Sequence, residues 1–194
     1  MSEVLAIKSL NDIDKIKKYL KKKNDRDYTL FVFGINIGLR ASDLVSLKVK
    51  DIYNNNGTVK EELKLTEKKT DKNRTLFINE SAAAVLNNYY KVAQFKSADD
   101  YIFQSQKGDN QPLETRSLNR LVKQWCKECH LKGNYGSHSL RKTFGYHLYI
   151  KNSTNPFIVP YLQKIFNHCS QSVTLRYIGI EKENIDNLYS DLNL

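Results

Sequence analysis

Hydrophobic positions near the start of the chain recur at the three- and four-residue spacing of an α-helix. A first amphipathic helix is predicted after Ser9, and lysines occupy most positions outside its apolar stripe. The stripe consists of Ile13, Ile16, Tyr19 and Leu20. A second helix is predicted over residues 25–37, and Gly38 ends it. The chain therefore begins with a helical pair, of which the first member has a cationic face.

Beyond position 48 the pattern becomes typical of short β-strands separated by turns. Three strands are predicted, over residues 49–53, 62–67 and 75–78. The turn formers Asn, Gly and Asp separate them at 54–57 and 70–73. We therefore predict a small antiparallel three-stranded β-sheet.

The remaining pattern is mainly helical, which makes the predicted fold class mixed, mainly α with that small sheet. Asn79 and Ser137 are predicted to begin helices, another helix is expected over 114–130, and a short helix ends at Tyr177. After Gly179 the spacing of apolar residues stays helical, at Ile185, Leu188 and Leu192. We predict one domain over residues 1–179 and a tail helix over 180–194.

The net charge of the chain indicates which class of partner it binds. The 194 residues contain 31 Lys and Arg against 21 Asp and Glu, which gives a formal charge of +10 and a pI of about 9.4. This balance suits a polyanion, either nucleic acid or an anionic membrane surface. No apolar run approaches the roughly 18 residues of a membrane span, and the first residues lack the layout of a signal peptide. We therefore expect a cytoplasmic protein without a membrane partner.

The three cysteines do not form a disulfide framework, because their number is odd and two of them lie three residues apart in a predicted helix. Cys126, Cys129 and His130 match the spacing of a redox dithiol and of a haem attachment motif. A redox pair should begin a helix, whereas this one ends a helix. Zinc would require four ligands, and no second pair of suitable spacing exists. We expect reduced thiols and no metal.

Several cationic side chains stand where a phosphate could be bound. Arg40 follows a glycine turn and precedes a short helix, of which Ser42 is the predicted N-cap and Asp43 belongs to the first turn. A guanidinium beside unpaired backbone amides can bind a phosphate through a bidentate fork. The alternative is an ordinary surface pair between Arg40 and Asp43.

A second group of chemically capable residues lies between Gly136 and Tyr177. His138 and Arg141 are three residues apart and therefore share one face of a helix. His168 follows the end of the next helix, and Tyr177 ends the one after that. In a basic protein these are the side chains needed to bind a phosphodiester and to attack it with a phenolic oxygen.

Taken together, the segments resemble the catalytic domain of the tyrosine recombinases, the phage integrase family of DNA strand exchangers. The resemblance runs from about Asp12 to Tyr177 and rests on four motifs in the same order. The motifs are Gly38-Leu39-Arg40-Ala41-Ser42-Asp43-Leu44, Lys69-Thr70-Asp71-Lys72-Asn73-Arg74, His138-Ser139-Leu140-Arg141, and Asn167-His168-Cys169-Ser170 with Tyr177 nine residues beyond His168. Two residues depart from the family pattern: Asn167 replaces a usual Gly and Phe166 a usual Leu.

The resemblance implies a role for each matching residue. Tyr177 would be the nucleophile and would form a 3′-phosphotyrosyl bond with DNA, while His138 would accept the phenol proton. Arg40 and Arg141 would bind the phosphate, Lys69 would donate a proton to the leaving 5′ oxygen, and His168 would hydrogen-bond to a nonbridging oxygen. Asp43 would support Arg40. The remaining matches, Lys68, Lys72, Arg74 and Lys142, would contact DNA. The covalent link conserves the energy of the bond, so that neither a metal, a cofactor nor ATP is expected.

The implied partner is double-stranded DNA that carries recombination sites, bound by a protein that is a monomer in solution and a dimer or tetramer on DNA. The tail is expected to dock on a neighbouring protomer, the alternative being its own domain. Two rival functions share the chemistry or the fold: a type IB topoisomerase, and a DNA-binding regulator with little or no strand exchange. The chain is either a short stand-alone recombinase or a fragment of a longer one.

Overall fold

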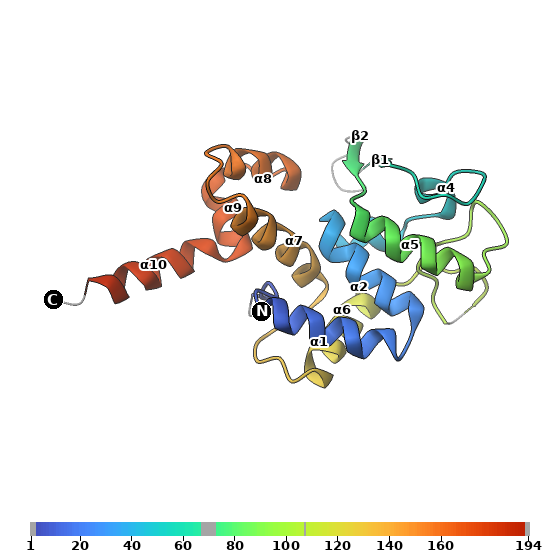
Figure 1. The fold of residues 1–194 in the computed structure, drawn as a ribbon, viewed down its shortest axis with the longest axis horizontal. Coiled ribbons are helices and arrows are strands. Elements are labelled where there is room, and N and C mark those ends of the chain that lie inside the picture. The colour runs from blue at the N-terminus through green and yellow to red at the C-terminus, as the bar shows by residue number, and fades with distance from the viewer. Residues whose placement is uncertain (1–2, 67–72, 107, 193–194) are drawn as a thin grey trace.

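The computed structural model describes residues 3–66, 73–106 and 108–192, drawn in colour in Figure 1. Helices dominate these ranges, and one hairpin of two strands interrupts them. The elements in chain order are α1 (Leu10–Lys21), α2 (Asp25–Ile37), α3 (Ala41–Val45), α4 (Val49–Ile52), β1 (Glu62–Thr66), β2 (Asn73–Phe77), α5 (Glu80–Ala93), α6 (Thr115–Glu128), α7 (Ser137–Lys151), α8 (Ile158–Phe166), α9 (Gln171–Ile178) and α10 (Ile180–Asp191). The mainly helical fold class predicted from the sequence is confirmed.

Side-chain caps fix where several helices begin. Ser9, Asn24, Asn79 and Ser170 each accept a hydrogen bond from the backbone N–H three residues ahead, which satisfies one of the donors that a helix start leaves open. Two predicted caps are wrong. Ser42 lies inside α3, whose N-cap is Arg40, and Ser137 lies inside α7, whose N-cap is Gly136.

The strand predicted over residues 49–53 is also wrong. Residues 49–52 form the helical turn α4, which places Val49 and Ile52 together in the core. The carboxylate of Asp51 accepts a hydrogen bond from the backbone N–H of Lys48 at 2.8 Å and so closes the turn at its start. The described sheet contains only the antiparallel pair β1 and β2, in which Glu62 pairs with Phe77 and Thr66 with Asn73.

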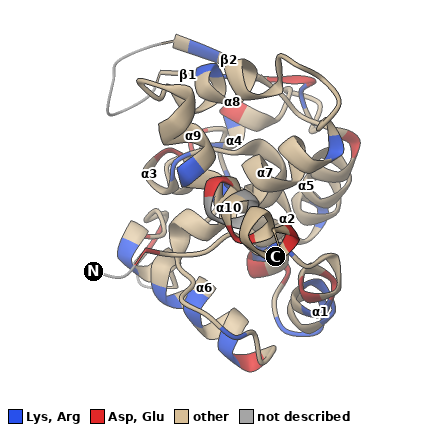
Figure 2. Cartoon of the chain, turned by 90° about the vertical axis from the view of Figure 1, so that its left-hand side faces the viewer, with Lys and Arg blue, Asp and Glu red and all other residues tan. Residues whose placement is uncertain are grey.

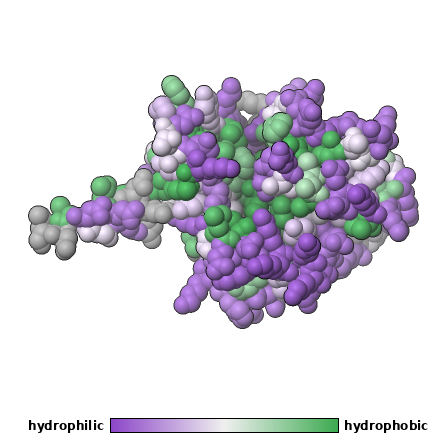
Figure 3. All heavy atoms as spheres, in the orientation of Figure 1, coloured by the Kyte–Doolittle hydropathy of each residue, from purple (hydrophilic) through white to green (hydrophobic). Residues whose placement is uncertain are grey.

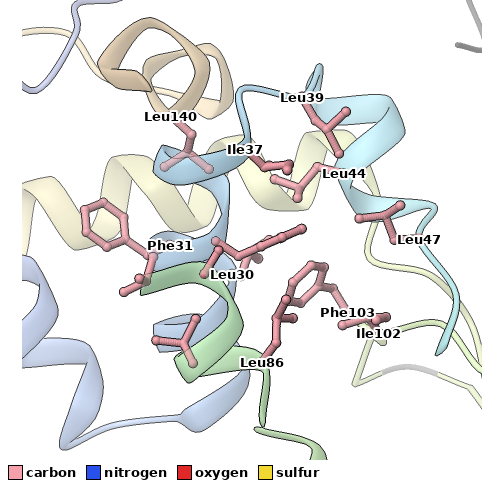
Figure 4. Packing of buried hydrophobic residues seen from close by; sticks show 14 of the residues in the cluster. Leu30, Phe31, Ile37, Leu39, Leu44, Leu47, Leu86, Ile102, Phe103 and Leu140 are labelled. Atoms are coloured by element: carbon pink, nitrogen blue, oxygen red, sulfur yellow. The ribbon is translucent and has the colours of Figure 1, made fainter. Parts of the chain in front are cut away.

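The main core is built around α2, which packs against α5 on one side and α7 on another (Figure 4). Its consecutive residues Leu30, Phe31, Val32 and Phe33 are at most 3% exposed, so that nearly every face of this helix is covered. A second cluster joins α7, α8 and α9 through Tyr146, Ile158, Leu162, Phe166 and Ile178. The two cores meet along α7, which is the helix that carries His138 and Arg141.

The last helix, α10, projects away from the rest of the molecule (Figures 1 and 3). Its packing against other helices is with α9. Four of its large hydrophobic side chains are exposed: Ile185, Leu188, Tyr189 and Leu192. Within the described residues no helix combines the length and the apolar character that crossing a membrane requires.

Candidate active site

Arg141 is the buried centre of the site, with only 3% of its surface exposed. One guanidinium nitrogen, Nη1, donates to the carbonyl oxygen of Gly38, and Nη2 donates to that of Phe166 at 3.0 Å. The guanidinium also stacks 4.6 Å from the ring centroid of Phe166. Arg141 on α7 therefore ties together the end of α2 and the end of α8, and these contacts fix its guanidinium.

Arg40 enters the site from the turn that follows α2. Gly38 caps that helix at φ +67°, in the left-handed region, and a Cβ at this position would lie 2.5 Å from Cδ1 of Phe144. The close approach explains why a glycine stands two residues before Arg40. The charge of the half-buried Arg40 acts on both His168 and Tyr177, which places all three in one cluster.

His168 follows α8 and is oriented by a threonine. Asn167 ends α8 at φ +53°, a left-handed conformation that asparagine tolerates better than most residues other than glycine. This accounts for Asn where the family pattern has Gly. The Nδ1 atom of His168 lies 3.1 Å from Oγ1 of Thr174, which itself donates to the Ser170 carbonyl. Burial and the charges of both arginines lower the pKa of His168.

Tyr177 lies on α9 with its ring 5.0 Å from the ring of His168, in an edge-on arrangement. Burial raises the pKa of the Tyr177 phenol. The charge of Arg141, a side-chain hydrogen bond with it, and the charge of Arg40 oppose that rise and lower the pKa. The site thus holds a protonated phenol beside two cations that favour its phenolate.

His138 lies one turn before Arg141 on α7, at the surface. Desolvation by surrounding atoms and the charges of Arg141 and Lys142 lower the pKa of His138 below the usual 6.5. Its imidazole is therefore neutral at pH 7 and able to accept a proton. The described structure thus brings together Arg40, Arg141, His168 and Tyr177, and it places His138 beside Arg141 on α7.

Lys69, the sixth predicted catalytic residue, lies outside the described residues, as do Lys68 and Lys72. The ladder that leads to them ends at the pair Thr66 and Asn73. Arg74 on β2 is half-buried and lines a cavity of about 570 Å³ beside the part of the ladder nearest the turn.

Asp43 lines the same cavity and is 4% exposed. Its backbone N–H donates to the carbonyl oxygen of Arg40 at 3.1 Å, which is a backbone contact with the residue it was predicted to support. Its Oδ2 atom is buried and makes no hydrogen bond to the described residues.

Lys142, a predicted DNA contact, is 5% exposed. Its ammonium forms an ion pair with Glu3 and lies 5.0 Å from the ring centroid of Tyr177. Sequence reasoning missed Glu3 and Thr174 as members of the site. Glu3 lies 139 positions from Lys142, and no spacing rule connects them. Thr174 has a local signal, because it follows Ser170 by one helical turn and faces back toward His168.

The Cys126 and Cys129 pair shows no sign of reactivity. Cys126 is buried, and burial raises the pKa of its thiol to about 12. The pKa of the half-buried Cys129 is also raised, mainly by burial. Across the described ranges, His, Cys, Asp and Glu side chains nowhere gather in a group of three that could hold a metal ion.

Comparison with known proteins gives consistent relatives. The sequence profile of the Phage integrase family matches residues 5–184. A protein of Bacillus subtilis (strain 168) named "Probable integrase/recombinase YoeC" is 40% identical over 183 residues, covering 94% of this chain and 93% of that protein. Tyrosine recombinase XerC of Caldanaerobacter subterraneus is 28% identical over 92% of this chain, which spans only 46% of XerC.

A similar fold occurs in the crystal structure of the XerH site-specific recombinase bound to palindromic difH substrate, a post-cleavage complex. The TM-score is 0.70 at 21% identity, over 94% of this chain and 51% of the XerH chain. The chain thus spans about half the length of XerC and XerH but nearly all of YoeC.

Proposed function

The chain belongs to the phage integrase family, and from that premise we propose that it is a site-specific DNA recombinase of the integrase or invertase type. It cleaves and rejoins DNA through a 3′-phosphotyrosyl intermediate on Tyr177. The observation that carries the proposal is the convergence of Arg40, Arg141 and His168 on this tyrosine. The names of YoeC, XerC and XerH support the same activity.

The chemistry begins with the phosphate. A phosphodiester repels nucleophiles, and attack adds negative charge to its nonbridging oxygens. Arg141 has five N–H donors and uses two nitrogens to hold backbone carbonyls, so that further donors remain for Tyr177 and for a phosphate oxygen. Arg40 binds the other nonbridging oxygen. Because the protein fixes Arg141 before DNA arrives, little reorganisation accompanies the reaction.

Two proton transfers accompany the exchange of oxygens at phosphorus. The neutral imidazole of His138 accepts the phenol proton, and the phenolate oxygen of Tyr177 forms the new bond to phosphorus. The bond to the 5′ oxygen breaks, and Lys69 supplies the proton that this oxygen needs. Because the Thr174 hydroxyl donates to Ser170, Nδ1–H of His168 donates to Thr174, and His168 protonated beside the phosphate donates from Nε2 to a nonbridging oxygen. The reverse steps, with a 5′ hydroxyl of a partner strand as nucleophile, join the exchanged strands without a metal, a cofactor or ATP.

Basic surface supports a DNA partner. α6 exposes Arg116, Arg120, Lys123 and Lys127, and these positions form a line of Lys and Arg along the helix in Figure 2. Contacts with the phosphate backbone would give strong binding at low salt that weakens as salt rises. We assign Lys68, Lys72 and Arg74 of the hairpin to DNA contacts as well.

The exposed face of α10 suggests how copies assemble. We propose that residues 1–179 form the catalytic domain and that the tail helix, residues 180–194, docks on a neighbouring protomer through Ile185, Leu188 and Leu192, which are 47%, 70% and 60% exposed. The protein is then a monomer in solution and a dimer or tetramer on DNA. Docking in trans would cover an apolar face that the fold of one chain leaves open.

The deciding experiment is covalent trapping on a nicked suicide duplex, in EDTA and without ATP. The protein is expected to form a denaturation-resistant adduct with the 3′ end, and Tyr177→Phe is expected to lose it while binding the duplex within a few fold. Trapping by Tyr177→Phe would overturn the proposal. Relaxation of plasmid without a matched site would instead assign the chemistry to a topoisomerase, and absence of any adduct would assign the protein to DNA-binding regulators.

A further inference from the structure

The first described residues form a strap, which we define as residues 3–8, across the helix that carries Arg141. The backbone N–H of Ile7 donates to Oγ1 of Thr143 at 2.8 Å, and the carbonyl oxygen of Ile7 lies 2.9 Å from Nε2 of His147. Ile7 is 1% exposed, so the middle of the strap belongs to the core. The strap is therefore held in register along α7, and its first residue, Glu3, reaches Lys142.

Lys142 has little contact with water. Its side chain is 6% exposed, whereas the side chain of its partner Glu3 is 64% exposed. A buried ammonium needs a nearby negative charge, because removal from water costs several kcal/mol unless an anion offsets it. In the free protein that anion is Glu3. The other neighbour of the ammonium is the ring of Tyr177, whose centroid is 5.0 Å away.

Glu3, Lys142 and Tyr177 line one cavity of about 470 Å³. The negative charge of Glu3 raises the pKa of Tyr177, against the lowering by Arg141 and Arg40. The remaining titratable neighbours are His168, edge-on to the ring, and, in the same cavity, Lys8, Asp186 and the ion pair of Arg176 with Glu181. The Glu3 carboxylate and the ring of Tyr177 thus adjoin a single buried cation.

We propose that Glu3 and the phenolate of Tyr177 compete for the ammonium of Lys142, so that the strap restrains ionisation of the nucleophile until Glu3 withdraws. The phenol proton leaves to solvent in the free protein or to His138 on DNA. Glu3 is the exposed partner, and an approaching phosphate backbone repels it from the site. The inference rests on the proposed function of Tyr177 and makes Lys142 a positioning residue rather than a DNA contact.

The first test titrates Tyr177 without DNA. Fluorotyrosine placed at position 177 reports the phenol pKa by fluorine NMR in the full chain. Glu3→Gln is expected to lower that pKa, Glu3→Lys to lower it further, and Lys142→Met to raise it. In the Lys142→Met background the effect of Glu3→Gln should fall by at least half. Glu181→Gln is the matched control, because it removes a carboxylate from the same cavity, and it should leave the pKa in place.

The second test measures single-turnover cleavage of the suicide duplex. At pH 7 Glu3→Gln should cleave about threefold faster, since a lower pKa of the Tyr177 phenol raises the phenolate fraction. Three results would each overturn the competition. The first is an unchanged or raised pKa of Tyr177 in Glu3→Gln and Glu3→Lys, and the second is an equal shift of that pKa with and without Lys142. The third is slower cleavage at every pH. Both Glu3 variants alter an exposed side chain, which keeps the test available if Lys142→Met does not fold. Failure of the wild type to form an adduct would instead overturn the proposed function and leave the titration intact.

Discussion

At the scale of single residues, the site depends on side chains held by the backbone rather than by other charges. Two guanidinium nitrogens of Arg141 donate to the carbonyl oxygens of Gly38 and Phe166. These carbonyls lie at the C-terminal ends of α2 and α8. Neutral carbonyls orient the guanidinium without cancelling its charge. A carboxylate in the same place would hold Arg141 equally well but would weaken its attraction for a phosphate.

The lowered pKa of His138 predicts the pH dependence of cleavage. A histidine accepts a proton only when neutral, and it is neutral above its pKa, which desolvation, Arg141 and Lys142 place below 6.5. The kcat/KM for cleavage should therefore rise with pH through a limb that lies below pH 6.5 and be flat near neutrality. His138→Asn should remove this limb and slow cleavage by about 10²- to 10⁴-fold. A limb above pH 6.5, or one that survives in His138→Asn, would contradict the assignment.

Thr174 should matter through the orientation of His168. Thr174→Val keeps the shape of a fully buried side chain but removes the hydroxyl that holds Nδ1. Cleavage is expected to slow about tenfold, because a misplaced catalytic group costs up to about 10²-fold, while duplex affinity stays within twofold. Thr174→Ser retains the hydroxyl and should recover most of the rate. Equal rates for the two variants would show that His168 needs no such support.

At the scale of elements, the hairpin between β1 and β2 should deliver the general acid. Lys69→Ala is expected to slow cleavage of an ordinary duplex by about 10²- to 10⁴-fold. It should spare a duplex whose leaving 5′ oxygen is replaced by sulfur, because a thiolate leaves without a proton. Lys68→Ala is the matched control: it removes a proposed DNA contact, so any loss of rate should be equal on the two substrates. If Lys69→Ala slows both substrates equally, the lysine has another role.

Local signals predicted most of the elements. Helical spacing and capping residues located α1, α2 and α9, and the turn formers located the hairpin. Residues 49–53 misled the prediction, because apolar residues at 49, 52 and 53 fit a short strand or one helical turn. The choice was decided by Asp51, which caps the turn, and by Asp100, whose carbonyl oxygen accepts from the backbone of Val49 at 2.9 Å. The second contact is distant in sequence and leaves no local pattern.

At the scale of the whole molecule, the site is divided among segments that only the fold unites. Motifs identify Arg40, Arg141 and Tyr177 because each stands in a recognisable local frame. Glu3 has no such frame, since its effect depends on a strap that reaches α7 from the other end of the chain. Residues of the recognisable motifs, which would contact the phosphate, can therefore be predicted from the sequence. Residues such as Glu3, which change the pKa of those groups, are found only from the structure.

The projecting α10 predicts a difference between binding one site and assembling on two. Removal of residues 180–194 should leave affinity for a DNA half-site within about twofold, because the arginines and the hairpin stay intact. The complex on two adjacent half-sites should weaken strongly, since each large apolar side chain that docks contributes about 1.5–3 kcal/mol. Ile185→Ser with Leu188→Ser tests the apolar face alone, and the exposed Ser190→Asp is the control that keeps it. Native gel shifts with one and with two half-sites measure both affinities. Equal losses of affinity on both DNAs would place α10 on its own domain. Selective loss of the two-site complex would place α10 on a neighbouring protomer.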